Sequence, residues 1–198
     1  SALDPFLKIR MRAELKKLQT SLGITFVHVT HSQEEAMALA DLIVVMNEGR
    51  IEQADTPRAV FERPATAFVA RFMGDHNVLS GRIVERTTHG LFIEVVGGGR
   101  FFALGAAPVE DETADIAIRT DHVRIGAMPA DGLGFDGIVS NVEYLGAKVK
   151  LTVTTAFTDE FTAVLTDAAF FASPVRVGEG VTLSWDQPDS IVLGRIVK

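Results

Sequence analysis

The sequence contains no cysteine, which excludes a disulfide framework and a thiolate metal site. It also lacks any apolar run of the roughly 18 residues that a membrane span requires. At its start there is no basic stretch followed by an apolar segment and a small-residue cleavage site, the pattern of a signal peptide. These absences predict a cytoplasmic protein without direct membrane insertion.

Basic side chains are scarce as well. The chain has 19 Lys and Arg residues against 26 Asp and Glu residues, and its formal net charge is −7 at pH 7. Proteins that bind nucleic acids or anionic membranes neutralise phosphates with basic side chains, so this balance has the wrong sign. We therefore expect no nucleic-acid partner.

Apolar residues make up 47% of the 198 residues, which is enough for a buried core. Residues 1–76 alternate helical periods with short apolar runs, whereas residues 77–198 consist of short apolar runs separated by Gly, Asp and Pro. We predict an α/β domain over 1–76 followed by an all-β domain over 77–198, the latter a small barrel or sandwich.

The first helix is predicted to begin with Asp4 as N-cap and Pro5 at the first helical position, and to stop at Gly23. Its apolar side chains recur every three or four residues and form one stripe: Leu7, Met11, Leu15, Leu18 and Leu22. The β-branched run at 24–29 (ITFVHV) then predicts a strand buried on both faces of a parallel sheet.

The rest of the first part continues as α/β structure. Ser32 and Glu35 have the spacing of a capping box in front of an apolar helix. The next elements are, in order, a buried strand at 42–46, a hairpin strand at 50–53, a capped helix from Thr56 to about Glu62, and a helix over 67–72 that Gly74 ends.

In the second part, turn signals separate many short strands. They are predicted at 78–86, 91–96, 100–104, 114–126 with a break, 135–144, 147–155, 160–165, 180–186 and 191–197. Three consecutive glycines, Gly97 to Gly99, form a tight turn between two of them. They are not a phosphate loop, because a strand and not a helix follows.

His31 is the main candidate for chemistry. It follows the predicted strand at 24–29 and precedes a helix N-terminus, the place where open α/β sheets bind ligands. An imidazole there can donate to a phosphate oxygen, or it can simply bond a loop carbonyl. His28 is expected on the opposite face of the strand, where it would serve packing.

Other sites are excluded by what the sequence does not offer. His76, His89 and His122 lie on separate elements without carboxylates at ligand spacing, so we expect no metal centre. No G-x-S-x-G nucleophile motif occurs, and no G-x-x-x-x-G-K-[ST] loop is present to cradle a nucleoside triphosphate.

Several segments, taken in order, resemble the C-terminal part of an ABC transporter ATP-binding subunit. They are SALD (1–4), ITFVHVTH (24–31), SQEEAMALAD (32–41) and the run over 42–74. The second part resembles the TOBE region of such subunits, at 77–81, 118–124, 142–146 and 183–186. The resemblance implies part of a P-loop NTPase-like domain followed by an OB-like TOBE barrel.

The resemblance also implies residue roles. Ser1 to Asp4 correspond to the D-loop, with Asp4 coupling two nucleotide sites across a dimer, and His31 to the catalytic switch histidine at the γ-phosphate. Ser1, Asp4 and His31 are thereby implied to contact the nucleotide. The parent protein is implied to hydrolyse ATP with Mg²⁺, whereas this part, lacking the P-loop, signature and Walker B motifs, is expected to bind neither and to be inactive.

The implied partners are a second copy, in a homodimer, and the membrane permease subunits of an importer. The protein would be cytoplasmic and peripheral on the inner face of the plasma membrane. The segment 60–81 resembles polyamine (spermidine/putrescine) and ferric-iron importers, with the polyamine type favoured.

A second hypothesis remains open: a stand-alone OB-like module that senses a small anion or a partner protein. Arg119, Asp121 and His122 could bind a small ligand or fix a turn. Eight phenylalanines of the second part could stack bases on an OB surface, but the acidic charge favours core packing: Phe92, Phe101, Phe102, Phe135, Phe157, Phe161, Phe170 and Phe171.

Overall fold

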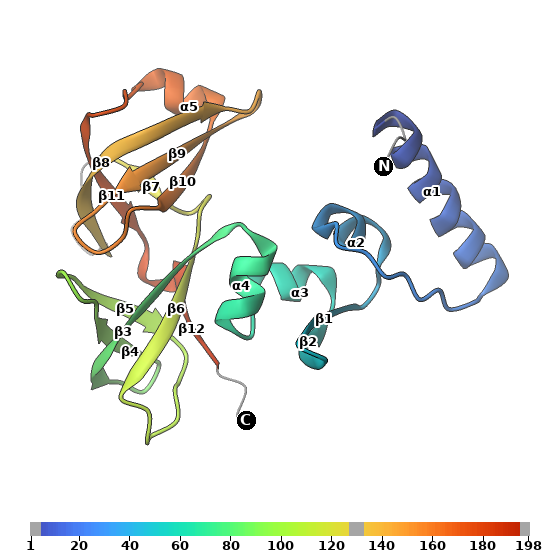
Figure 1. Cartoon of the computed structure of the whole chain (residues 1–198), viewed down its shortest axis with the longest axis horizontal. Helices are drawn as coiled ribbons and strands as arrows, with labels where there is room; N and C mark the ends of the chain where they lie inside the picture. The colour runs from blue at the N-terminus through green and yellow to red at the C-terminus, as the bar shows by residue number, and fades with distance from the viewer. Residues whose placement is uncertain (1–4, 127–132, 195–198) are drawn as a thin grey trace. The chain divides into compact units, whose positions relative to one another are not determined.

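The computed structural model of the chain describes residues 5–126 and 133–194 (Figure 1). The chain divides into two compact units, Ser1–Arg63 and Pro64–Lys198. The first unit holds helices and one hairpin, and the second holds nearly all of the strands. The expected order, α/β followed by all-β with an OB-like barrel, is confirmed.

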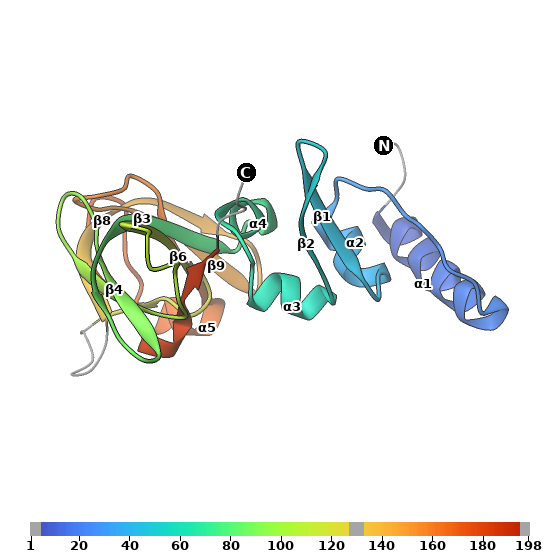
Figure 2. The same ribbon diagram turned by 90° about the horizontal axis from the view of Figure 1, so that it is seen from below.

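The helices of the first unit begin and end where the capping residues place them. They are α1 (Pro5–Leu22), α2 (Gln33–Leu39) and α3 (Pro57–Glu62) (Figure 2). Gly23 ends α1 at a positive φ of 63°. Ser32 Oγ accepts from the Glu35 amide at 3.2 Å, and Thr56 Oγ1 accepts from the Ala59 amide at 3.3 Å. Asp4, the expected N-cap of α1, lies outside the described residues.

The strands of the first unit are β1 (Ile43–Asn47) and β2 (Arg50–Asp55), which pair antiparallel as the predicted hairpin. Glu48 and Gly49 form its turn, both at positive φ, as tight hairpin turns require.

The predicted strand at 24–29 is wrong for this structure. Residues 24–30 are neither helix nor strand, and Val27 and Val29 are 90% and 92% exposed. A strand needs a neighbour to accept and donate its backbone hydrogen bonds, and in the described part of the first unit these residues pair with neither β1 nor β2. The composition of the run is that of a buried strand, but the pairing that would bury it is not there.

The second unit begins at Pro64, and not at 77 as the sequence suggested. Helix α4 (Ala67–Met73), capped by Thr66 and ended by Gly74 at φ 79°, buries Ala70 against Ala117 and Leu193 of the β-structure. The sequence boundary followed helical periodicity, which identifies a helix without showing what it packs against. By its contacts α4 belongs to the all-β unit.

Five strands close a barrel in the order β12-β5-β4-β3-β6. Their bounds are β3 (His76–Arg86), β4 (Gly90–Glu94), β5 (Arg100–Leu104), β6 (Thr113–Arg119) and β12 (Ser190–Leu193). The turn over Gly97–Gly99 joins β4 to β5, and all three glycines have positive φ, as predicted for a tight turn.

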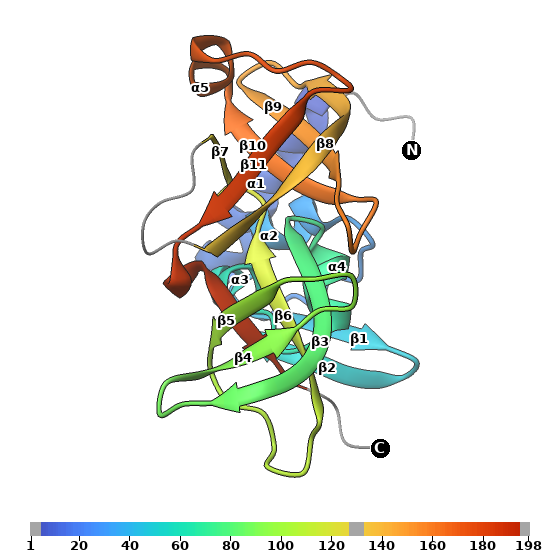
Figure 3. The same ribbon diagram turned by 90° about the vertical axis from the view of Figure 1, so that its left-hand side faces the viewer.

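The other five strands form an open sheet in the order β10-β9-β8-β11-β7, which Figure 3 shows next to the barrel. They are β7 (Arg124–Ile125), β8 (Leu133–Tyr144), β9 (Lys148–Thr154), β10 (Phe161–Thr166) and β11 (Gly180–Trp185). All of these overlap predicted strands. The helix α5 (Asp167–Ala172) and the 3₁₀ turn η1 (Gln187–Asp189) were not predicted, because six and three residues are too short for a periodic signal.

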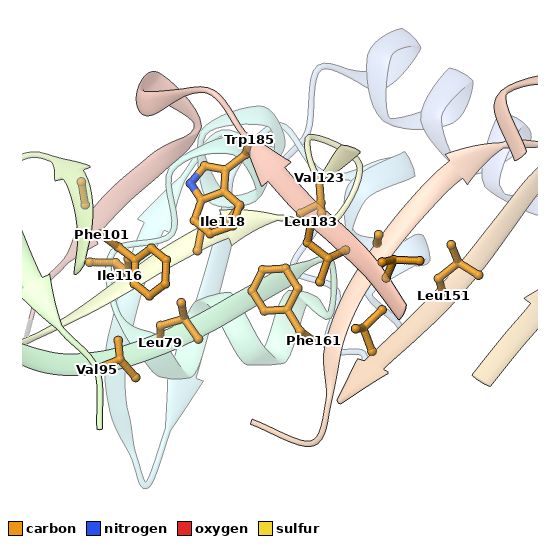
Figure 4. Packing of buried hydrophobic residues seen from close by; sticks show 14 of the residues in the cluster. Leu79, Val95, Phe101, Ile116, Ile118, Val123, Leu151, Phe161, Leu183 and Trp185 are labelled. Carbon is orange, nitrogen blue, oxygen red and sulfur yellow. The ribbon is translucent and has the colours of Figure 1, made fainter. Parts of the chain in front are cut away.

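One hydrophobic core joins the barrel to the sheet (Figure 4). Trp185 of β11 lies 5.6 Å from Phe101 of β5 and 5.8 Å from Phe161 of β10, measured between ring centroids. The core-packing interpretation of the phenylalanines is therefore confirmed for most of them. Phe171, with 61% of its surface exposed, and Phe92, a partly exposed ring covered by the Arg100 guanidinium, lie outside the core.

Candidate functional site

His31 lies directly before Ser32, the N-cap of α2. Its side chain is exposed, and in the described part of the chain no hydrogen bond or ion pair holds it. The alternative role, a bond to a loop carbonyl, is thus not observed. Ser1 and Asp4, the other two candidate residues, lie outside the described residues.

The loop in front of α2 is shaped by Thr30 and Glu35. Thr30 Oγ1 donates to Glu35 Oε2 at 2.8 Å and accepts from the Ser32 amide at 3.0 Å. The hydrogen bond from Thr30 lowers the pKa of Glu35, with a smaller contribution from His28. The predicted capping box is therefore half formed, because the Glu35 carboxylate binds Thr30 and not the Ser32 amide.

His28 does not pack in a core, which corrects the expectation. Its side chain is half exposed, and its Nε2 lies 3.7 Å from Glu35 Oε2. The reason is the missing strand: without a neighbour, the chain has no buried face for His28 to enter. Thr30, Glu35 and His28 together fix the backbone that presents His31.

Basic residues of α1 hold α2 and the residues after it. Lys16 Nζ lies 2.6 Å from Asp41 Oδ1, and Arg12 lies 3.4 Å from Glu34. Both Glu34 and Asp41 are well exposed, so each pair adds less than about 1 kcal/mol. These pairs position α1 without burying its apolar stripe, whose leucines remain exposed.

The cluster at Arg119 fixes a turn. Arg119 holds Asp121 through two hydrogen bonds of 3.0 and 2.7 Å, and the His122 amide donates to the Arg119 carbonyl. His122 Nδ1 lies 2.7 Å from Asp189 Oδ1 in η1. Because these groups bind one another, the turn interpretation is the one that the structure supports.

His76 gives the second unit a pH-dependent stability. Burial, reinforced by the charges of Arg119 and His122 against an opposing effect of Asp121, lowers the pKa of His76 from 6.5 to about 4. The folded pKa lies below the unfolded one, so protonation favours unfolding. The contribution of His76 is complete above about pH 6.5 and is lost as the pH falls toward about 4.

As the pH is lowered from neutral to about 4, the free energy of unfolding of His76→Gln should fall less than that of the wild type. Urea unfolding at each pH measures this difference. His89 is exposed, so His89→Gln is the matched control and should keep the wild-type pH dependence of stability. An unchanged pH dependence in His76→Gln would contradict the assignment.

Within the described ranges, no three His, Asp or Glu side chains come together as a metal site. Over the same residues, none of the helices combines the length and apolar character that crossing a membrane demands.

The family model of the TOBE domain matches residues 116–193. The spermidine/putrescine import ATP-binding protein PotA of Rubrobacter xylanophilus is 36% identical, over 98% of this chain and 51% of that protein. The corresponding protein of Thermobifida fusca is 38% identical, over 97% of this chain and 50% of that protein. The corresponding protein of Oleidesulfovibrio alaskensis is 43% identical, over 77% of this chain and 42% of that protein. The chain spans about half the length of the curated relatives it matches.

Among solved structures, the cytoplasmic molybdate-binding protein ModG, with molybdate bound, matches with a TM-score of 0.50 and 14% identity. The match covers 60% of this chain and 96% of that one. At this identity the likeness concerns the fold alone, and it agrees with the OB-like barrel. The TOBE match and the nearly complete alignment with PotA proteins show that the chain carries a TOBE domain over 116–193 and is similar, over almost its whole length, to the TOBE-bearing part of the ATP-binding subunits of ABC importers.

Proposed function

We propose that this chain is part of the ATP-binding subunit of an importer for polyamines of the spermidine/putrescine type. The observation that carries the proposal is the alignment of 97–98% of the chain with proteins of that name. In the whole subunit, hydrolysis of ATP would supply the free energy that drives import. This chain contributes a phosphate-contacting histidine and the TOBE barrel.

His31 has the properties that a phosphate contact requires. Its imidazole is exposed, it precedes a helix N-terminus, and in the described residues it is not engaged elsewhere. A neutral or protonated imidazole donates a hydrogen bond to a phosphate oxygen. We assign His31 to the γ-phosphate, and Ser1 and Asp4 to the contact between two nucleotide sites. The P-loop and the Mg²⁺ ligands would come from the other half of the subunit.

The first unit supports this arrangement through the apolar surface that it leaves uncovered. Val27 and Val29 project from a segment with a strand-like sequence, and the leucines of α1 remain exposed. Burying each such side chain contributes about 1.5–3 kcal/mol. The relatives are about twice as long as this chain. The other half of the subunit would therefore supply neighbouring strands to residues 24–29 and cover α1.

We expect the 198-residue chain alone to show no ATP hydrolysis above buffer, because it has no loop to hold the triphosphate. Co-expressed with the N-terminal half of the Rubrobacter xylanophilus protein, it should hydrolyse ATP. His31→Ala should then lower turnover about 100-fold or more, the usual effect of removing one donor to developing charge.

His89→Gln is the control histidine, exposed and in the other unit, and should leave turnover unchanged. Turnover by the chain alone that His31→Ala abolishes would contradict the proposal. So would a reconstituted enzyme indifferent to His31→Ala.

We further propose that the chain pairs with a second copy and, in the whole subunit, binds membrane permease subunits on the inner face of the plasma membrane. We assign the pairing to the TOBE barrel of residues 77–198, as the resemblance to TOBE regions implies, and in the chain by itself the exposed apolar side chains of the first unit add surface that a second copy can cover. Light scattering at micromolar concentration should give about twice the chain mass. A monomeric mass would contradict the homodimer.

A further inference from the structure

A polar pocket of about 420 Å³ lies in the second unit, outside the region of His31. It is formed where α4 and the start of β3 face the strands β9 and β10. Its size is within the range of small-molecule sites, about 300–1,000 Å³. The lining residues that matter are Arg71, His76, Lys150, Thr152, Glu160 and Thr162.

The wall formed by β9 and β10 is polar because alternate residues of a strand point to opposite faces. Leu151 and Val153 are buried in the core, whereas Lys150 and Thr152 are on the other face. Thr162 of β10 stands directly opposite Thr152 in the register. Two hydroxyl groups and one ammonium group therefore share this face.

The floor of the pocket is fixed by Asn77. Its Nδ2 donates to the Thr162 carbonyl at 2.8 Å, and its Oδ1 accepts from the Thr162 amide at 2.7 Å. The backbone of Thr162 is thereby satisfied, and the neighbouring Thr120 carbonyl accepts from the Val164 amide. The polar groups left to meet a ligand are thus side chains on a rigid frame.

The charge in the pocket is positive, although the chain as a whole is acidic. Arg71, in the last turn of α4, and Lys150 have no ion-pair partner among the described residues. Glu160 provides one carboxylate, which is not within ion-pair distance of either cation. His76 is neutral at pH 7, since burial lowers its pKa to about 4.

We propose that this pocket binds inorganic phosphate, which retains a proton at neutral pH, with Arg71 and Lys150 facing its charge and the hydroxyls of Thr152 and Thr162 donating to its oxygens. Glu160 accepts the hydrogen bond of the P–OH group. The site is independent of the proposed ATPase function, because it uses no residue near His31.

Glu160 determines which anions fit. A carboxylate is an acceptor only, so it repels an oxyanion that carries no proton and binds one that can donate. Sulfate and molybdate are fully deprotonated at neutral pH, whereas phosphate keeps a proton. The pocket therefore discriminates by the hydrogen bond and not by shape.

The test is a titration of the 198-residue chain with inorganic phosphate, followed by amide NMR signals of Thr152 and Thr162 and by calorimetry. Parallel titrations use glycerol phosphate, sulfate and molybdate. Glycerol phosphate is a monoester whose second pKa of about 6 leaves it mostly without a P–OH proton above neutral pH, so it should bind more weakly than inorganic phosphate. Tighter binding of glycerol phosphate would overturn the role assigned to Glu160. Sulfate and molybdate should bind about tenfold more weakly or worse.

Arg71→Gln and Lys150→Met should each weaken phosphate binding about tenfold or more, the effect of losing one charge-assisted hydrogen bond. Lys148→Met is the matched control, because Lys148 is on the same strand but does not line the pocket. Glu160→Gln should bring sulfate close to phosphate in affinity. Bound phosphate should also raise the pKa of His76.

The absence of phosphate binding would overturn the proposal, as would equal binding of sulfate or molybdate to the wild type. Equal effects of Lys148→Met and Lys150→Met would overturn it too, since they would show diffuse attraction without a site. If circular dichroism shows that Lys150→Met does not fold, the phosphate affinity of Arg71→Gln decides whether the site exists, because Arg71 is exposed and its substitution should not disturb folding.

Discussion

Trp185→Ala should lower the free energy of unfolding of the second unit by about 3–5 kcal/mol, the usual effect of truncating a large buried aromatic residue. Trp185 is fully buried, and its ring contacts those of Phe101, Phe135 and Phe161 at centroid distances of 5.6, 5.6 and 5.8 Å. These residues come from both the barrel and the sheet. The cavity would thus weaken the joint between the two.

The indole also makes a hydrogen bond that alanine cannot replace. Its Nε1 donates to Ser190 Oγ at 3.3 Å, and Ser190 Oγ in turn donates to the Phe102 carbonyl at 2.6 Å. Ser190 is itself fully buried, so the substitution disturbs a polar contact as well as packing.

Urea unfolding followed by circular dichroism measures the effect, because the variant has lost its one tryptophan and with it the fluorescence signal. Phe171→Ala is the control: this aromatic ring is mostly exposed and should contribute about 1 kcal/mol or less. A loss for Trp185→Ala no larger than that of Phe171→Ala would contradict its central place in the core.

Asn77→Ala should cost about 1–3 kcal/mol, because it leaves two half-buried backbone groups without their protein partners. The Asn77 side chain makes both hydrogen bonds to Thr162 that a neighbouring strand would otherwise make to the edge strand β10. It therefore closes that part of the sheet edge against pairing with other chains. Asn141→Ala, at an exposed position of β8, should change stability by no more than about 0.5 kcal/mol.

Asn77→Asp tests the two hydrogen bonds to Thr162 with almost no change in the shape of the side chain. When protonated, the introduced carboxyl group would still donate to the Thr162 carbonyl, whereas its ionised form would repel that carbonyl. Its folded pKa would be raised above the ordinary value of about 3.9, so stability would be present below that pH and lost as the pH rises through the folded pKa. Unfolding by urea across this range should show the loss. A variant whose stability does not fall with rising pH would show that Thr162 does not depend on the amide.

Local sequence signals determined the elements of this protein. Ser32, Thr56, Thr66 and Gly74 cap or end their helices because capping depends on a few adjacent residues. The strands of the second unit follow from alternation and from turn residues between them. The ordered segments also revealed the resemblance to importer ATP-binding subunits and singled out His31, without showing what His31 touches.

Tertiary structure decided everything that depends on a partner distant in the sequence. The run at 24–29 has a strand's composition, yet it stays unpaired because pairing needs a neighbour that composition does not supply. Helix α4 joined the barrel because Ala70 packs against Ala117 and Leu193. Asn77 and Thr162 are 85 residues apart, and no local pattern connects them. Local conformation is set by neighbours along the chain, whereas burial, pairing and the grouping of charges in a pocket are set by neighbours in space.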